Sequence, residues 1–560
     1  MKLRVIKNNT KTFESKLKEK GYIDLAKCFD CHFYGDDNRA IEVNLKCKIN
    51  IEEMKYLITI AKELNDIHAQ NDAFLIIQML NDTDGTLIKS LNGFMKAFET
   101  YIKKDLIDGW LYALDITGNY MPKLVDSIQH IPNNPETGQK AYVLIFFEFS
   151  SPRKEQMNHR GKKDNLTFEL KEVYNKTIIQ ILGEKMLFKE TEDLKLKYTK
   201  HLDAYNIYHS KIGMQFIATS NALSRNENYS EKSSIKGHKL VNDQFETDDM
   251  PSIAQETNAS FFNESALTNN IFDEDIELKL LDNQKNVLMK LPFHPYIKMF
   301  DLESHKELWI LPGNIKPYEY DKDVATKLVL QEDHRDLIDV LVNDADVVLE
   351  DIVSNKSGGT TILCKGEAGL GKTLTAEVYS ETVSKPLYLV HSGQLGTNPD
   401  NIDKRLNEIL KRTERWGAIL LLDEADVYIR KRDNSMEHNA IVAAFLRKLE
   451  RFSGIVFMTT NRSDDVDDAI ASRCIAVITY THPVGKDLYK LWKILSKQYK
   501  IELSNELTNQ LCDLFEKTSG RDIKELLKLA SKFKSQKQSV IDINMFKKCA
   551  MFRGLKLKKP

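Results

Sequence analysis

A glycine-rich segment at residues 366–373 has the composition needed to bind the phosphates of a nucleotide. It reads Gly-Glu-Ala-Gly-Leu-Gly-Lys-Thr and follows an apolar run at 361–364. A loop of this kind between a strand and a helix presents successive backbone N–H groups and the positive end of the helix to phosphate oxygens. Lys372 would neutralise the β- and γ-phosphates, and the Thr373 hydroxyl would be a ligand of Mg²⁺. The segment therefore predicts a nucleotide and Mg²⁺ as ligands.

Two carboxylates follow a second apolar run, at 418–422. A parallel strand that is buried on both faces would deliver them at its C-terminal edge. Asp423 is predicted to coordinate Mg²⁺ through water, and Glu424 to act as the general base or to orient the attacking water. In isolation, a buried strand that ends in surface acids would explain the pattern. The phosphate-binding segment upstream favours the catalytic interpretation.

A third apolar run, at 454–460, ends at Asn461, whose amide could hold the attacking water. Arg473 follows too soon in the sequence to return easily to the phosphates of its own chain. It would more naturally face the nucleotide of a neighbouring subunit, where a guanidinium supplied in trans stabilises the charge of the transition state. A surface ion pair with Asp467 or Asp468 is the structural alternative.

The chain resembles the AAA family of ATPases over about residues 330–555, where GEAGLGKT, LLLDEAD, FMTTN and IASR follow one another. The resemblance implies ATP hydrolysis by a ring of identical subunits, usually a hexamer, with Asn461 as a polar sensor and Arg473 as the trans-acting finger. It makes Glu424, Asn461 and Arg473 the catalytic residues and Thr373 and Asp423 the metal ligands. The nucleotide-binding residues under this resemblance are Gly366, Glu367, Ala368, Gly369, Leu370, Gly371, Lys372, Thr373, Leu374 and Arg521.

Arg521 belongs to a segment, Ser519-Gly520-Arg521-Asp522, that opens a helix as the second sensor motif of the family does. From there it could reach the γ-phosphate and close the lid. Many relatives lack an arginine at this place, and pairing with Asp522 or Glu525 is an adequate structural account.

The chain departs from the family pattern in the region that would line a central pore. Residues 391–396 contain no aromatic side chain, so the sequence gives no support to threading of a polypeptide. The basic residues 430–432 could form a ring in the pore, and a solvated loop is the simpler interpretation. Residues 423–426 spell the motif of DEAD-box RNA helicases. Only about 100 residues follow 459–461, which leaves no room for the second domain of those helicases.

Composition limits the classes of function. The chain has 560 residues, 42% of them hydrophobic, and a net charge of -2, so several domains are expected and no global field favours nucleic acid. Seven Cys in 560 residues are few and odd in number, which indicates a reducing compartment. The sequence also has neither an apolar N-terminal segment nor a run of roughly 18 apolar residues. Together these features predict a soluble, cytoplasmic protein without membrane contact. Cys28, Cys31 and His32 match a haem-attachment string; packed, reduced thiols are the simpler interpretation.

The elements that must position these residues divide the chain into five segments. Apolar spacing predicts helices at 51–66 and 86–114 and a buried strand at 141–147. The predicted fold class is α/β, a P-loop NTPase with a three-layer parallel sheet and a C-terminal helical lid, preceded by an α+β region. The predicted boundaries are an α+β domain at 1–219, a polar insert or linker at 220–284, a small β module at 285–325, the AAA ATPase domain at 326–483 and the lid at 484–560.

These expectations lead to three hypotheses about function. The first is a homo-oligomeric ring whose ATP hydrolysis remodels a protein partner held by the N-terminal region. The second is a nucleotide-gated scaffold or regulatory switch, for example in a defence or stress complex, which the missing aromatic at 391–396 favours. The third is a DNA-remodelling ATPase, which salt-dependent binding to DNA would reveal.

Overall fold

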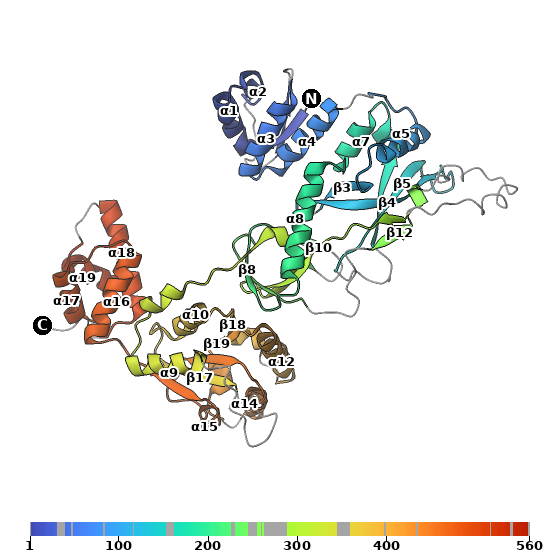
Figure 1. Cartoon of the computed structure of the whole chain (residues 1–560). Helices are drawn as coiled ribbons and strands as arrows, with labels where there is room; N and C mark the ends of the chain where they lie inside the picture. Colours follow the sequence, from blue (N-terminus) through green and yellow to red (C-terminus); the bar gives the residue numbers. More distant parts are fainter. Residues whose placement is uncertain are drawn as a thin grey trace.

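Figure 1 shows a computed structural model of the chain, coloured from the N-terminus in blue to the C-terminus in red. Its description covers residues 2–30, 40–45, 47, 49–81, 85–115, 117–152, 162–225, 230–244, 255–258, 260–262, 288–343, 359–396, 399–432, 435–515, 517–537 and 541–557.

The N-terminal part is a small α+β unit. Its two strands pair antiparallel, and its helices bury a core that includes Leu3, Phe13, Met54 and Leu57. The elements are β1 (Lys2–Ile6), α1 (Thr10–Glu19), α2 (Ile23–Lys27), β2 (Ala40–Asn44), α3 (Ile51–Glu63) and α4 (Ile67–Asn81). The helix predicted at 51–66 corresponds to α3, which begins at an Asn50 capping box.

A five-stranded antiparallel sheet follows, in the order β6-β5-β4-β3-β7. Its strands are β3 (Trp110–Leu114), β4 (Tyr120–Ile131), β5 (Tyr142–Phe149), β6 (Lys162–Glu169) and β7 (Leu187–Lys189). The helices of this part of the chain are α5 (Leu91–Lys103), α6 (Leu170–Val173), α7 (Ile178–Glu184) and α8 (Glu192–Tyr208). The helix predicted at 86–114 is wrong at both ends, because α5 begins at Leu91 and ends at Lys103, after which Lys104 has an extended backbone. The apolar run 110–114 is strand β3, which pairs with strands on both sides.

A second antiparallel sheet has the order β10-β9-β15-β14-β11-β8-β16. We call this whole sheet the β module; it includes strands from outside the segment 285–325 for which a small β module was predicted. Its strands are β8 (Gln215–Ala218), β9 (Ala222–Arg225), β10 (Ser230–Ser233), β11 (Lys239–Asn242), β14 (Ile297–Asp301), β15 (Lys306–Ile310) and β16 (Ile315–Pro317). A separate pair joins β12 (Glu256–Asn258) to β13 (Leu288–Lys290). Of the segment predicted as a polar insert or linker at 220–284, the described residues contribute β9, β10 and β11 to the β module and β12 to the separate pair. Residues 226–229, 245–254, 259 and 263–284 lie outside the described residues.

The α/β part that follows contains a parallel sheet in the order β18-β19-β20-β17-β21, with helices on both faces. The strands are β17 (Thr360–Gly366), β18 (Leu387–His391), β19 (Ile419–Asp423), β20 (Ile455–Thr460) and β21 (Ala476–Tyr480). The helices are α9 (Glu332–Asn343), α10 (Lys372–Thr382), α11 (Ser392–Leu395), α12 (Pro399–Trp416), α13 (Asp426–Ile429), α14 (Met436–Leu449) and α15 (Asp468–Ala471). The predicted three-layer α/β fold is confirmed.

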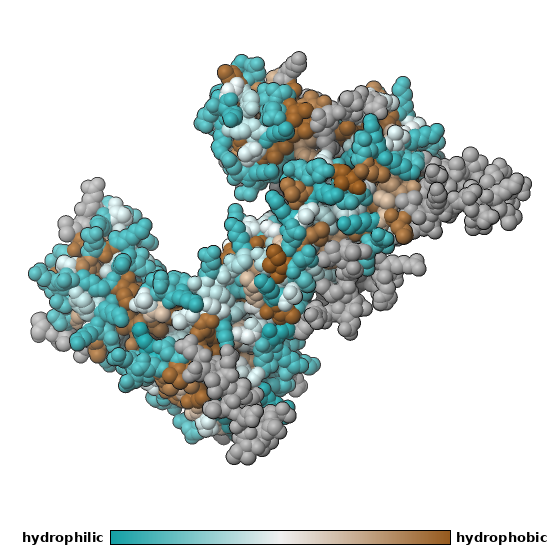
Figure 2. Space-filling view, viewed as in Figure 1, coloured by the Kyte–Doolittle hydropathy of each residue, from teal (hydrophilic) through white to brown (hydrophobic). Residues whose placement is uncertain are grey.

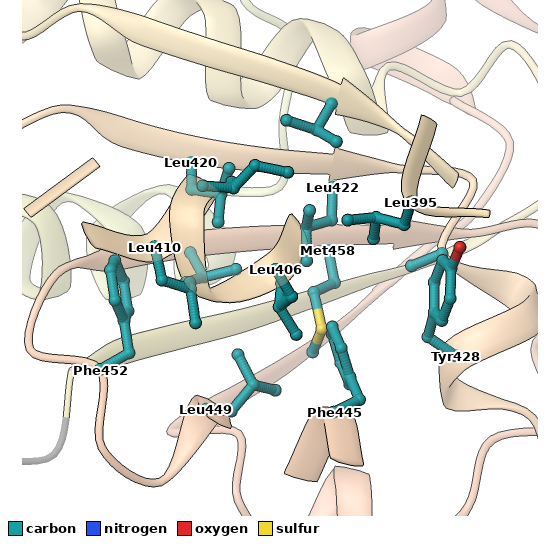
Figure 3. Close-up of a cluster of buried hydrophobic side chains, with 14 of the residues drawn as sticks. Leu395, Leu406, Leu410, Leu420, Leu422, Tyr428, Phe445, Leu449, Phe452 and Met458 are labelled. Carbon is teal, nitrogen blue, oxygen red and sulfur yellow. The ribbon is translucent and has the colours of Figure 1, made fainter. Parts of the chain in front are cut away.

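One core lies between the sheet and the helices α12 and α14 (Figure 3). Leu406, Leu410 and Phe445 pack there against Leu420 and Leu422, whose strand is buried on both faces. Such a strand can place polar groups only at its ends, because an unpaired buried polar group is costly. Asp423, the last residue of β19, and Glu424 after it therefore lie at the edge of the sheet.

The lid is a group of four helices around Trp492, which is fully buried. They are α16 (Gly485–Gln498), α17 (Asn505–Leu514), α18 (Gly520–Lys537) and α19 (Ile543–Phe552). On the face drawn in Figure 2 the lid surface is largely hydrophilic. In the described part of the chain, every helix is too short or too polar to cross a membrane.

A buried carboxylate joins the β module to the domain that contains the parallel sheet. Asp243 is 1% exposed; it accepts a hydrogen bond from Trp416 Nε1 at 2.9 Å and forms ion pairs with Arg412 and Arg415. Phe300 of β14 packs beside this cluster, with its ring centroid 5.2 Å from that of Trp416. The C-terminal end of α12 is therefore fixed to the β module.

Candidate functional site

The phosphate-binding loop joins the end of β17 to the start of α10. Gly369 and Gly371 have φ values of +83° and +99°, in the region that favours glycine. Lys372 is only 7% exposed, and its Nζ donates to the carbonyl oxygens of Gly366 and Glu367, each at 2.7 Å. Burial lowers the pKa of Lys372. Its ammonium is thus held inside the curve of the loop, where a phosphate would meet it.

A second group of oxygens stands beside the first turn of α10. Thr373 Oγ1 donates to Asp423 Oδ1 at 2.8 Å, although the two residues lie on different elements. Hydroxyl and carboxylate oxygens are the ligands that Mg²⁺ prefers, and Mg²⁺ in nucleotide sites usually takes few protein ligands. The chemistry of this donor pair fits the predicted metal site.

Glu424 adopts a left-handed backbone conformation, with φ +54°. This conformation costs a non-glycine residue on the order of 1 kcal/mol and is often found at functional sites. The side chain is exposed and makes no hydrogen bond or ion pair to the residues that the structure describes. Its carboxylate is therefore open to solvent beside Asp423.

Asn461 follows directly after β20 and reaches the phosphate-binding loop. Its Oδ1 accepts from Lys372 Nζ at 2.9 Å. β20 lies between β17 and β19 in the sheet, so the three segments predicted to act together meet at one edge. The structure brings Lys372, Thr373, Asp423 and Asn461 together as parts of a single cluster.

The other predicted nucleotide contacts belong to the same loop and helix. Gly366 lies against Tyr480 of β21, and Glu367 meets His482 Nε2 at 3.2 Å. Ala368 is exposed, Leu370 packs partly into the core beneath the loop, and Leu374 is 46% exposed.

Arg473 lies apart from this cluster. Its Nε donates to Glu450 Oε1 at 2.7 Å, and its Nη1 donates to the Ala469 carbonyl at 3.0 Å. The ion-pair partner is therefore Glu450, not Asp467 or Asp468. Asp467 instead pairs with Arg432, whose Nε is 3.3 Å away.

The lid touches the phosphate-binding loop at Arg521. Its backbone N–H donates to the Gly369 carbonyl at 3.4 Å, while its side chain is exposed. Pairing with Asp522 or Glu525, the structural alternative, is not observed. Asp522 pairs with Arg553 at 3.0 Å, and Glu525 pairs with Lys528 at 2.8 Å.

Two groups beside Asp423, those of Thr459 and His391, escaped the sequence analysis, whereas the neighbouring Thr460 binds a different acid. Thr459 Oγ1 donates to Asp423 Oδ1 at 2.6 Å, and Thr460 Oγ1 donates to Asp426. His391, at the end of β18, has its Nδ1 3.9 Å from Asp423 Oδ2. The available signal was two hydroxyl residues at the end of an otherwise apolar strand.

Of the haem-attachment string, the structure describes only Cys28. Cys28 Sγ lies 3.8 Å from Cys47 Sγ, and Cys31 and His32 are outside the described residues. Among the described residues there is no group of three potential metal ligands.

A parallel sheet with a phosphate-binding loop after one strand and acids after another defines an α/β nucleotide-binding domain of the P-loop type. Residues 362–481 match the family model for the ATPase family associated with various cellular activities (AAA). This segment is an AAA domain, as the sequence predicted.

Several relatives share this part of the chain. CD-NTase-associated protein 6 of Escherichia coli (strain MS 115-1) is 28% identical over 189 residues, 29% of this chain and 59% of the relative. The uncharacterized AAA family ATPase y4kL of Sinorhizobium fredii is 29% identical over 146 residues, 24% of this chain and 43% of the relative. ATPase family AAA domain-containing protein 3 of Bos taurus is 22% identical over 210 residues, 34% of this chain and 36% of the relative. The chain thus covers between 36% and 59% of the length of these relatives.

A chain of the solved structure of the E. coli MS115-1 HORMA:CdnC:Trip13 complex aligns at 16% identity with a TM-score of 0.35. The alignment covers 41% of this chain and 90% of that one.

Proposed function

We propose that this chain binds ATP with Mg²⁺ and hydrolyses it to ADP and phosphate. The observation that supports this most directly is the cluster at the edge of the sheet. Lys372 lies 2.9 Å from Asn461, and Thr373 lies 2.8 Å from Asp423. A cation, a hydroxyl, a carboxylate and an amide in this arrangement supply the groups that phosphoryl transfer needs for positioning and charge stabilisation.

Each residue has a separate task in the proposed reaction. Lys372 exchanges the carbonyls of Gly366 and Glu367 for phosphate oxygens. Thr373 and Asp423 would hold Mg²⁺, which when bound would neutralise charge on the phosphate oxygens. Glu424 accepts a proton from the attacking water, or orients it, and Asn461 holds that water toward the γ-phosphate.

The proposed assembly is a homo-oligomeric ring, hexameric as is usual for this family. In it, Arg473 of one subunit completes the site of its neighbour. Within the single chain Arg473 is held by Glu450, and the arginine is 36% exposed. An exposed ion pair of this kind contributes little stability, so a phosphate from a neighbour can replace the carboxylate.

The proposed outcome of hydrolysis is the remodelling of a protein partner bound by the N-terminal region. A regulatory switch is the second candidate, in which hydrolysis times the assembly of a complex and nothing is threaded. Two observations favour the switch: residues 391–396 lack an aromatic side chain, and one relative is named for its association with a CD-NTase.

The test of hydrolysis is Glu424→Gln, with Glu414→Gln on α12 as the matched control. We expect Glu424→Gln to lower ATP turnover by a factor of about 100 or more while ATP binding persists, because general base catalysis contributes about that much. The control should keep the wild-type rate. Wild-type turnover in Glu424→Gln would refute the role assigned to Glu424.

The test of assembly mixes two inactive variants, Arg473→Ala and Lys372→Ala. A finger supplied in trans predicts partial recovery of ATPase activity, because some interfaces pair an intact site with an intact arginine. Glu450→Ala should raise the activity of the wild-type site at low protein concentration by releasing Arg473. Activity that is independent of protein concentration, without recovery in the mixture, would exclude the ring.

A further inference from the structure

Thr459 binds three successive residues of the turn that carries the acids. It lies in β20 and is 2% exposed. Its Oγ1 donates to Asp423 Oδ1 at 2.6 Å and accepts from the Glu424 N–H at 3.0 Å. Its carbonyl oxygen accepts from the Ala425 N–H at 2.9 Å.

The position of Thr459 in the sheet explains why this turn needs a side-chain partner. The register between β19 and β20 ends at the pair Leu422 and Met458. Asp423 still pairs with His391 of β18, but the register with β20 does not extend to it, and Glu424 then has a left-handed backbone. At this turn the Thr459 hydroxyl accepts the Glu424 N–H and also holds the carboxylate of Asp423.

The same hydroxyl also sets the direction of the carboxylate that faces Thr373. Asp423 Oδ1 accepts hydrogen bonds from both Thr459 Oγ1 and Thr373 Oγ1. When Thr373 turns to a metal ion, the bond from Thr459 is the one that keeps Asp423 in place. A buried donor with a single low-energy arrangement restricts the rotamer of its acceptor.

Thr460, the next residue, offers a natural comparison. Its Oγ1 donates to Asp426 and accepts from the Arg462 N–H at 3.0 Å. It is equally buried, at 1% exposed, but it bonds to neither Asp423 nor Glu424.

We infer that Thr459 is a positioning residue for hydrolysis: it orients Asp423 toward the metal and holds the strained backbone of Glu424 so that the carboxylate faces the attacking water. This inference rests on the proposed ATPase function. Thr459 itself transfers no proton and touches no nucleotide.

The test compares Thr459→Val, Thr459→Ser and Thr460→Val in the full chain. Valine keeps the shape of threonine and removes the hydroxyl, whereas serine keeps the hydroxyl. We expect Thr459→Val to lower kcat about tenfold, the effect of losing one hydrogen bond to a charged group. It should also raise the Mg²⁺ concentration that gives half-maximal rate. Binding of a fluorescent ATP analogue in EDTA should not change, and Thr459→Ser should restore both kcat and the Mg²⁺ dependence.

Three outcomes would overturn the inference. These are an unchanged kcat in Thr459→Val, an equal shift of the Mg²⁺ dependence in Thr460→Val, or loss of ATP binding in EDTA together with a lower melting temperature. If the wild-type chain hydrolyses no ATP, the proposed function fails. The Mg²⁺ dependence of ATP binding in Thr459→Val then still tests whether Thr459 orients Asp423.

Discussion

Lys372 Nζ and Asn461 Oδ1 lie 2.9 Å apart, which joins the phosphate-binding loop to the end of β20. The two residues are far apart in the sequence, and the parallel pairing of β17 with β20 brings them to one edge. The bond leaves the amide group of Asn461 next to the place where a γ-phosphate would meet the ammonium. Any change of charge at Asn461 should therefore act on the nucleotide through Lys372.

Asn461→Asp tests this relationship, with Asn461→Ala as its control. An aspartate here would pair with Lys372 and repel the γ-phosphate, so ATP affinity should fall at least about tenfold, given the strength of a charge pair at this distance. Asn461→Ala removes the amide without adding charge and should lower kcat more than affinity. Equilibrium binding of ATP and steady-state rates separate the two effects. Equal affinity in both variants would contradict the prediction.

The contact between the lid and the loop can be tested at two glycines. A Cβ at Gly369 would lie 2.8 Å from the Cβ of Arg521 and 2.9 Å from Ser519 Oγ. A Cβ at Gly371 would meet nothing within 4 Å, although both glycines have positive φ. Gly369→Ala should therefore push the lid away from the loop, while Gly371→Ala strains the loop alone.

The readout for the glycine variants is the distance between α10 and α18, measured by fluorescence energy transfer. We expect it to increase in Gly369→Ala and to stay near the wild-type value in Gly371→Ala. The same increase in both variants would mean that backbone strain, rather than the contact with Arg521, decides the position of the lid.

The attachment of the β module depends on the buried carboxylate of Asp243. Asp243→Asn should reduce the free energy of unfolding by about 3 kcal/mol, because two arginines would lose their buried partner. Glu307 also pairs with Arg412, at 3.0 Å, but is 46% exposed. Glu307→Gln should therefore cost at most about 1 kcal/mol. Urea denaturation of the full chain compares the two, and similar losses would exclude a special role for burial.

The β module should also show a dependence of stability on pH. The hydrogen bond between His238 Nδ1 and Asp301 Oδ2, at 3.0 Å, raises the pKa of His238 above its ordinary value of 6.5. Because the folded chain binds this proton more tightly than the unfolded chain, the contribution is fully present below pH 6.5 and is lost as the pH rises through the raised pKa.

His238→Gln should remove this part of the pH dependence, which urea denaturation between about pH 6 and pH 8 would detect. The side chain is 30% exposed, so solvent screening keeps the effect small. His334→Gln, on α9, controls for the loss of a histidine elsewhere. A stability profile in His238→Gln that is parallel to the wild-type profile would contradict the prediction.

The sequence by itself determined the phosphate-binding loop, the α/β class of the domain around it and the chain positions of the acids. These features are local: a short run of glycines, a buried strand and the residues that follow it are read from neighbouring positions. Where a local pattern was ambiguous, prediction failed. Residues 110–114 continue an apolar spacing typical of a helix, yet they form β3, because pairing with strands on both sides outweighs helix propensity.

Only the tertiary structure decided which distant groups meet. Thr459 bonds to Asp423, Arg473 pairs with Glu450, and β11 pairs with β14 across a long stretch of sequence. None of these contacts leaves a periodic signal, because each depends on the register of a sheet or on the packing of helices from separate segments. Short sequence motifs were thus enough to predict which chemical groups the site contains, whereas the orientation of its acids depends on the pairing of strands in the sheet.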